Sequence, residues 1–73
     1  MISSADARLV AAALAEARGW PFDEPVQVRR RTPWIFGKPC WAVLTNADQL
    51  GSNVRVEIDA ASGVVLSCAF NPR

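Results

Sequence analysis

Apolar and polar residues alternate most clearly in the last third of the chain. Positions 54–59 read VRVEID, so that every second residue is apolar. This period of two predicts a strand with one buried and one solvated face. Asp59 and Gly63 then supply hairpin-turn chemistry, because Asp bonds nearby backbone groups and Gly accepts a positive φ. The apolar run 64–70 predicts an antiparallel return strand, but both of its parities carry apolar residues, so the pattern leaves its buried face undecided.

Two further strands are expected earlier in the chain. Residues 26–32 begin with alternating valines and end in three arginines and a threonine. This pattern is typical of an edge strand, because charges on an edge deter unwanted pairing. Residues 40–45 are apolar on both parities, which favours a central strand or a sheet whose second face is also covered in part.

An alanine-rich segment over residues 5–18 predicts a helix. Ser3 or Ser4 caps its start, with Asp6 in the capping-box position after Ser3, and Gly19 supplies a left-handed cap at its end. Small alanine side chains allow such a helix to lie close to a sheet. The stripe that we expect to face the sheet consists of Leu9, Val10, Ala13, Leu14 and Ala17.

Together these elements predict an α+β fold, with one N-terminal helix packed on a three- to four-stranded antiparallel sheet. We expect a single small domain over residues 1–73. Such a chain buries only about 60% of its unfolded surface, so a partner or a dimer interface could add stability. The expected core comprises Leu9, Val10, Leu14, Trp41, Val43, Val56 and Ile58.

Composition and net charge limit the cellular compartment and the classes of partner that we expect. The net charge of +1 gives no case for a nucleic-acid or membrane protein. No stretch approaches the roughly 20 apolar residues of a membrane span. Asp6 and Arg8 precede the alanine-rich run and Glu16 interrupts it, which excludes the pattern of an export signal. We therefore expect a cytoplasmic protein with reduced thiols.

The residues suited to catalysis are few. The chain has no His and no Tyr, and Cys40 and Cys68 lack the spacing of a metal-binding pair. A cysteine nucleophile needs a neighbouring base, and none is evident. Glu57 and Asp59 share one face of a strand, but carboxylates on a solvated hairpin face are expected to behave as ordinary acids. We expect no enzymatic activity, no metal and no cofactor.

One group of residues is a candidate binding surface. Trp34 and Phe36 are large, apolar and set in a segment with prolines on both sides, so they either cover the core or anchor a partner. Nearby arginines would orient carboxylates, which implies a protein partner with an acidic surface. The candidate partner-binding residues are Arg29, Arg31, Trp34, Phe36, Arg55 and Glu57.

Two segments carry a resemblance to known families. The sequence WAV at 41–43 and the hairpin VEIDAASGVVL at 56–66 resemble the PepSY group of small domains. They are also similar to the C-terminal part of bacterial immunity proteins with a nuclear-transport-factor-like fold, where a Trp-x-Val strand precedes an Ile-Asp-x-x-x-Gly hairpin. The order of elements matches over about residues 5–70, and the specific residues lie in 41–66.

The two resemblances imply different functions. An immunity protein acts inside a bacterial cell, where it binds and neutralises a cognate toxin, as in toxin–antitoxin pairs. A PepSY-like domain implies instead a constitutive structural or oligomerisation module, and a homodimer is left open. Arg-mediated nucleic-acid binding is a third and more distant alternative.

Replacing Trp34 and Phe36 by Ala separates the two roles of these rings. If they anchor a partner, we expect binding to weaken by ~2 kcal/mol or more, while the melting temperature barely moves. Calorimetric binding and thermal melts of the same variant measure both quantities. A variant that unfolds would show that the rings belong to the core.

Overall fold

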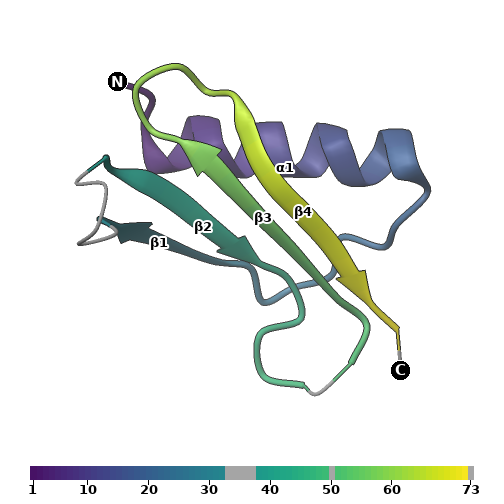
Figure 1. Cartoon of the computed structure of the whole chain (residues 1–73). Helices are drawn as coiled ribbons and strands as arrows, with labels where there is room; N and C mark the ends of the chain where they lie inside the picture. The colour runs from purple at the N-terminus through teal and green to yellow at the C-terminus, as the bar shows by residue number, and fades with distance from the viewer. Residues whose placement is uncertain (33–37, 50, 73) are drawn as a thin grey trace.

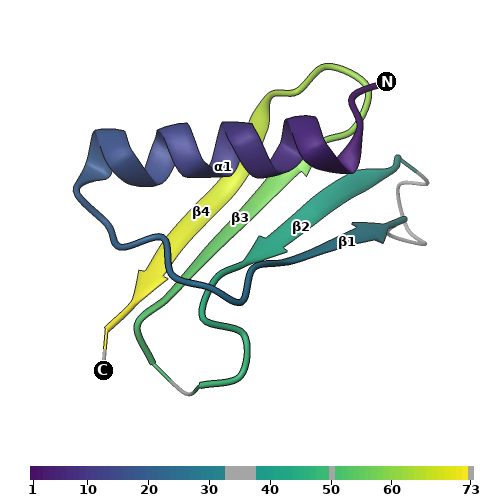
Figure 2. The same cartoon turned by 180° about the vertical axis from the view of Figure 1, so that it is seen from behind.

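The computed structural model describes residues 1–32, 38–49 and 51–72. Its helix α1 (Ser4–Arg18) lies across one face of an antiparallel sheet (Figure 1, Figure 2). The strands follow one another across the sheet in chain order. They are β1 (Gln27–Arg31), β2 (Cys40–Leu44), β3 (Asn53–Asp59) and β4 (Val65–Asn71). The predicted α+β fold class is confirmed, and the ends of every element lie within one residue of the expected ranges.

Local capping fixes both ends of α1. The Asp6 N–H donates to Ser3 Oγ at 3.1 Å, and the Ser3 N–H donates to Asp6 Oδ2 at 3.1 Å, which completes the predicted capping box. Gly19 adopts φ of 70°, and its N–H donates to the Glu16 carbonyl at 3.1 Å. Both caps thus pair backbone groups that the ends of a helix otherwise leave without a partner. The helix can therefore stop at Arg18, where the chain turns back towards the sheet.

The face that α1 presents to the sheet differs from the expected stripe. Ala7, Ala11 and Ala15 are fully buried, whereas Leu9 is 68% exposed. Leu9 lies about 200° around the helix from both Ala7 and Ala11, and so on its outer side. The prediction of Leu9, and of the exposed Ala13 and Ala17, as inward-facing residues was therefore wrong.

Close contact between the helix backbone and the sheet explains why the alanines of α1 face the sheet. Three alanines spaced four residues apart form a smooth strip, on which the helix backbone can rest directly against the valines of the sheet. Val10 and Leu14 pack beside this strip and are half-buried, as expected of core residues at its edge. A helix lying on leucines would stand farther from the sheet.

The sheet contributes the larger buried side chains. Val43, Val56 and Ile58 are buried as predicted, together with Val54. Trp41, which was expected in the core, is half-buried, and its Nε1–H donates to the Ile2 carbonyl at 3.1 Å. Trp41 therefore closes one rim of the core and ties the N-terminal segment to the sheet.

A bulge decides the buried face of β4. Glu57 pairs with Ser67, but Ile58 pairs with Val65, so Leu66 is an extra residue on β4. Val65 packs against the core before the bulge, and Cys68 and Phe70 pack against it afterwards. The residue that packs against the core before Leu66 therefore has an odd number, and those that do so after it have even numbers.

The connection between β2 and β3 is held by buried polar side chains. Asn53 Nδ2 donates to the carbonyls of Thr45 and Asn46 at 2.9 and 3.0 Å, and its Oδ1 accepts from the Gly51 N–H at 2.9 Å. Thr45 Oγ1 accepts from the Val54 N–H at 2.9 Å. These bonds fix the register in which β2 and β3 present their outward side chains.

The β3–β4 turn is built on one carboxylate. Asp59 Oδ1 accepts from the Ala61 N–H at 3.1 Å, and Oδ2 accepts from the Ser62 hydroxyl at 2.9 Å. The Gly63 N–H donates to the Asp59 carbonyl at 2.8 Å, and Gly63 adopts φ of 78°. The hydrogen bond from Ala61, followed by that from Ser62, holds the pKa of Asp59 below its ordinary value of 3.8.

Within the described ranges, no helix is both long and apolar enough to cross a membrane.

Replacing Ala11 by Leu should reveal the close contact between α1 and the sheet. The added atoms have no space between two packed layers, so the free energy of unfolding should fall by about 1–3 kcal/mol. Ala13→Leu is the matched control, because position 13 is exposed on the same helix, and it should change stability by no more than about 0.5 kcal/mol. Urea denaturation of both variants gives the comparison, and equal losses would contradict the observed helix face.

Asp59 should make a pH-dependent contribution to stability. Its pKa is lowered by folding, so the stabilisation is fully present above 3.8 and is lost as the pH falls through the lower folded pKa. Asp59→Asn should therefore be less stable than the parent at pH 7 and converge with it in acid. Urea midpoints measured across this range test the sign. A stability difference between Asp59→Asn and the parent that stays constant from pH 7 into acid would contradict this role of the carboxylate.

Candidate functional site

The face of the sheet opposite α1 carries alternate residues from β1, β2 and β3. One row across the strands joins Arg29, Ala42 and Glu57, and the next joins Gln27, Leu44 and Arg55. Neighbouring residues in each strand point the other way, towards α1. This surface, which we call the open face, therefore combines small or aliphatic side chains on β2 with long polar side chains on the two flanking strands.

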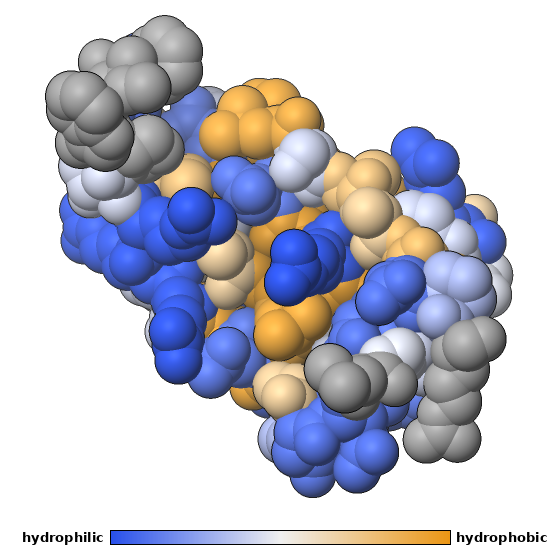
Figure 3. All heavy atoms as spheres, turned by 60° about the horizontal axis from the view of Figure 1, so that its bottom comes forward, coloured by the Kyte–Doolittle hydropathy of each residue, from blue (hydrophilic) through white to orange (hydrophobic). Residues whose placement is uncertain are grey.

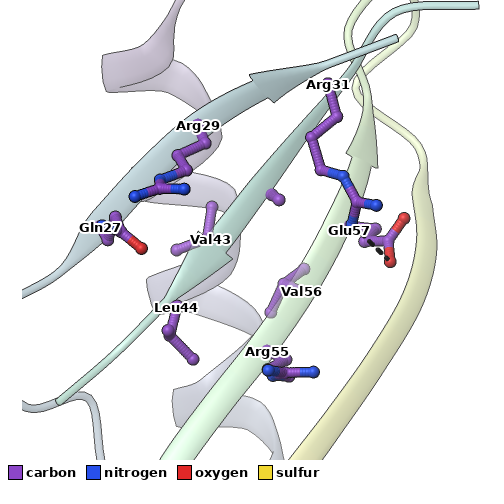
Figure 4. A pocket seen from close by; sticks show the side chains of 9 residues that line it. Gln27, Arg29, Arg31, Val43, Leu44, Arg55, Val56 and Glu57 are labelled. Carbon is purple, nitrogen blue, oxygen red and sulfur yellow. Dashed lines mark ion pairs between the residues drawn. The ribbon is translucent and has the colours of Figure 1, made fainter. Parts of the chain in front are cut away.

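The open face is hollowed over β2. The hollow has a volume of about 280 Å³, and Ala42 and Leu44 contribute to its apolar floor. Figure 3 shows apolar surface at the centre of this face, bordered and crossed by hydrophilic side chains. Figure 4 shows the long side chains of Arg29 and Arg31 projecting from β1 and that of Arg55 projecting from β3.

The charge around the hollow is mostly positive. Three arginines and one glutamate line it, so its net charge of +2 exceeds the +1 of the whole chain. Arg31 Nη1 lies 3.9 Å from Glu57 Oε1, a diagonal pair that crosses β2, and the two side chains are 61% and 43% exposed. Such a long and solvated ion pair contributes little to stability. Arg29 and Arg55 form no ion pair with any described residue.

The hollow collects most of the residues that the sequence singled out. Arg29, Arg31, Arg55 and Glu57 all line it, although they come from two strands separated by β2. Trp34 and Phe36, the remaining candidates, lie outside the described residues. The four charged residues thus form one surface, whose relation to the two aromatic rings stays a prediction.

Sequence reasoning missed the residues that complete this surface. Gln27, Ala42 and Leu44 also line the hollow, and none of them was a candidate. The signal for Ala42 and Leu44 was present, because the strand 40–45 is apolar on both parities. That pattern indicated a second face of mixed character but not which arginines would surround it.

The geometry offers little for acid–base or metal chemistry. Glu57 faces Arg31, and the Asp59 carboxylate is occupied by its own turn, so the two carboxylates do not share a proton-transfer site. Cys40 is buried and Cys68 half-buried, and both are free thiols. In the part of the chain that the structure describes, His, Cys, Asp and Glu side chains form no group of three or more that could hold a metal ion.

The chain matches no family model, no curated protein and no solved structure. Its function is therefore inferred from the chemistry of the open face.

Proposed function

We propose that this chain is a non-catalytic protein-binding domain that docks an acidic surface of a protein partner on its open face. The observation that carries the proposal is the hollow over β2, where Arg29, Arg31 and Arg55 surround an apolar floor. Guanidinium groups bind carboxylates through paired hydrogen bonds, and the apolar floor contributes affinity when water leaves it. Arginines beside desolvated apolar surface are a common arrangement at interface hot spots.

A second copy of the chain is a poor occupant of the same hollow. Two open faces laid against each other would bring several arginines together around one centre, opposed by a single Glu57 from each copy. Like charges in a desolvated contact cost several kcal/mol by rough estimate. The excess of positive charge therefore favours a different protein whose surface carries Asp or Glu.

Nucleic acid fits the hollow less well than an acidic protein. Glu57 would repel a phosphate backbone that approached Arg31. Binding of single strands usually relies on aromatic side chains for base stacking, and none of the described residues that line the hollow is aromatic. An acidic protein surface can bind without a long row of basic residues and without aromatic side chains for base stacking.

The partner class that we propose is a toxin, and the role is that of an immunity protein. This step rests on the resemblance of segments 41–43 and 56–66 to bacterial immunity proteins, together with the acidic-partner chemistry of the open face. An immunity protein needs a stable binding surface and no catalytic group. Neutralisation would follow from covering the toxin's own functional surface.

Charge reversal on the open face should weaken partner binding while leaving the fold intact. A photo-crosslinking residue at position 44, with position 13 on the outer side of α1 as its control, captures the partner in the native cell. Arg29→Glu and Arg55→Glu should each weaken binding to the purified partner at least tenfold, which corresponds to about 1.4 kcal/mol. Isothermal titration measures the loss, and rising salt should slow association.

The matched control for these variants is Arg30→Glu. Arg30 carries the same charge on the same strand but belongs to the opposite parity, and it is exposed. If Arg30→Glu weakens binding as much as Arg29→Glu, only net charge matters and the proposed site is wrong. For the immunity role, growth of cells that express the captured partner should be rescued by the parent chain and by Arg30→Glu, but not by Arg29→Glu.

A further inference from the structure

The outer edge of β4 has main-chain hydrogen-bonding groups that pair with no other strand of the described residues. β4 is the last strand of the sheet. The Thr45 N–H donates to the Val54 carbonyl at 3.1 Å, so Val54 directs its backbone groups towards β2. Because successive residues of an antiparallel strand alternate in this direction, Arg55 and Glu57 direct theirs towards β4. By the same alternation, Cys68 and Phe70 direct their N–H and C=O groups away from β3 and into the open edge.

The two edges of the sheet are protected very differently. β1 carries Arg29, Arg30 and Arg31 in succession, and such charges oppose further pairing. β4 contains no charged residue over its seven positions, VLSCAFN. Val64 and Leu66, beside and within this strand, are 58% and 59% exposed. An uncharged edge flanked by exposed aliphatic side chains is prone to pair with another strand.

The bulge restricts where a new strand can pair. Leu66 interrupts the regular register, which leaves Ser67–Asn71 as the straight part of the edge. Ala69 lies at the centre of this part, with its side chain exposed on the open face. Cys68 and Phe70, which carry the free backbone groups, lie symmetrically on either side of Ala69.

We infer that β4 pairs antiparallel with β4 of a second copy of this chain, about a twofold axis that passes beside Ala69. In this register Cys68 of each copy exchanges two hydrogen bonds with Phe70 of the other, and the two Ala69 residues face each other. The strand is self-complementary because its centre is small and uncharged, so that two copies meet without repulsion. Two sheets of four strands thereby become one continuous sheet.

Packing on the face of the sheet that α1 covers also favours a second copy of the chain as the partner of β4. Trp20 stacks on Phe70 with ring centroids 6.0 Å apart, and both side chains are half-buried. Phe70 is the last residue of β4 that packs against the core, so this aromatic pair lies at the rim of the core. The second copy would place its own Cys68 beside Phe70 and so cover this rim on both sides of the axis.

Sedimentation equilibrium from about 1 μM to 1 mM tests this inference directly. The parent chain should show a monomer–dimer equilibrium. Ala69→Lys and Ala69→Glu each place like charges opposite one another at the axis, so each variant alone should dimerise at least about tenfold more weakly. An equal mixture of the two variants should recover the dimer, because a lysine of one copy then faces a glutamate of the other across the axis.

Control variants separate strand pairing from loss of the fold. Ser67→Lys is the matched control, since position 67 faces Asn71 of the second copy and should leave dimerisation unchanged. Ala69 lies opposite Arg55 within its own chain, so circular dichroism checks that both variants at position 69 stay folded. A monomeric parent, an Ala69→Lys variant that dimerises as tightly as the parent, or a mixture that dimerises no better than either variant alone would each overturn the proposed pairing.

The pairing is independent of the proposed docking of an acidic protein. Arg29→Glu should weaken partner binding at least tenfold yet leave the dimer intact, because Arg29 lies on the far edge strand. If the parent is monomeric but still binds its partner, only the pairing of β4 is wrong. If it dimerises but binds no acidic partner, only the proposed function is wrong.

Discussion

One short helix can cover only one face of a four-stranded sheet, and the rest of this structure follows from that limit. Ala7, Ala11 and Ala15 allow α1 to lie directly on the valines of β2 and β3, so the inner layer is closed by very small side chains. The opposite face has no such cover among the described residues. Its side chains must therefore be compatible with water, and β1 and β3 meet this requirement with arginines and a glutamate.

The same limit explains why the open face suits binding. β2 lies between two other strands and cannot be wholly polar without weakening the centre of the sheet, so Ala42 and Leu44 remain on its outer side. Long charged side chains line the same hollow from the neighbouring strands, and arginine side chains of this kind can cover apolar surface with their aliphatic parts while the guanidinium groups stay in water. Such a surface is compatible with water in the free protein. Burial of its apolar part would still favour binding when a complementary partner displaces the water.

Sequence periodicity predicted the elements well because it reports burial on each strand separately. The period of two at 54–59 placed Arg55 and Glu57 together on one face, as it did Arg29 and Arg31 on another strand. It could not show that the two pairs surround one hollow, because that depends on the register through β2. The face of α1 was missed for a different reason. Hydrophobicity ranks Leu9 above Ala11, whereas close packing against a sheet selects the smaller residue.

The two proposed associations depend on different physical interactions. Docking on the open face depends on exposed arginines, whose attraction for carboxylates falls as salt screens it over about 10 Å at 0.1 M. Pairing of β4 depends on main-chain hydrogen bonds and on apolar contacts around Phe70, which salt hardly weakens. Because the twofold axis of such a strand pair stands perpendicular to the sheet, both open faces of a dimer lie on the same side. The neutral edge would thus place two cationic hollows on one side of the joined sheet, with β3 and β4 of each copy between them. A partner with two acidic surfaces at a matching separation would bind them with an effective concentration that a single chain cannot provide.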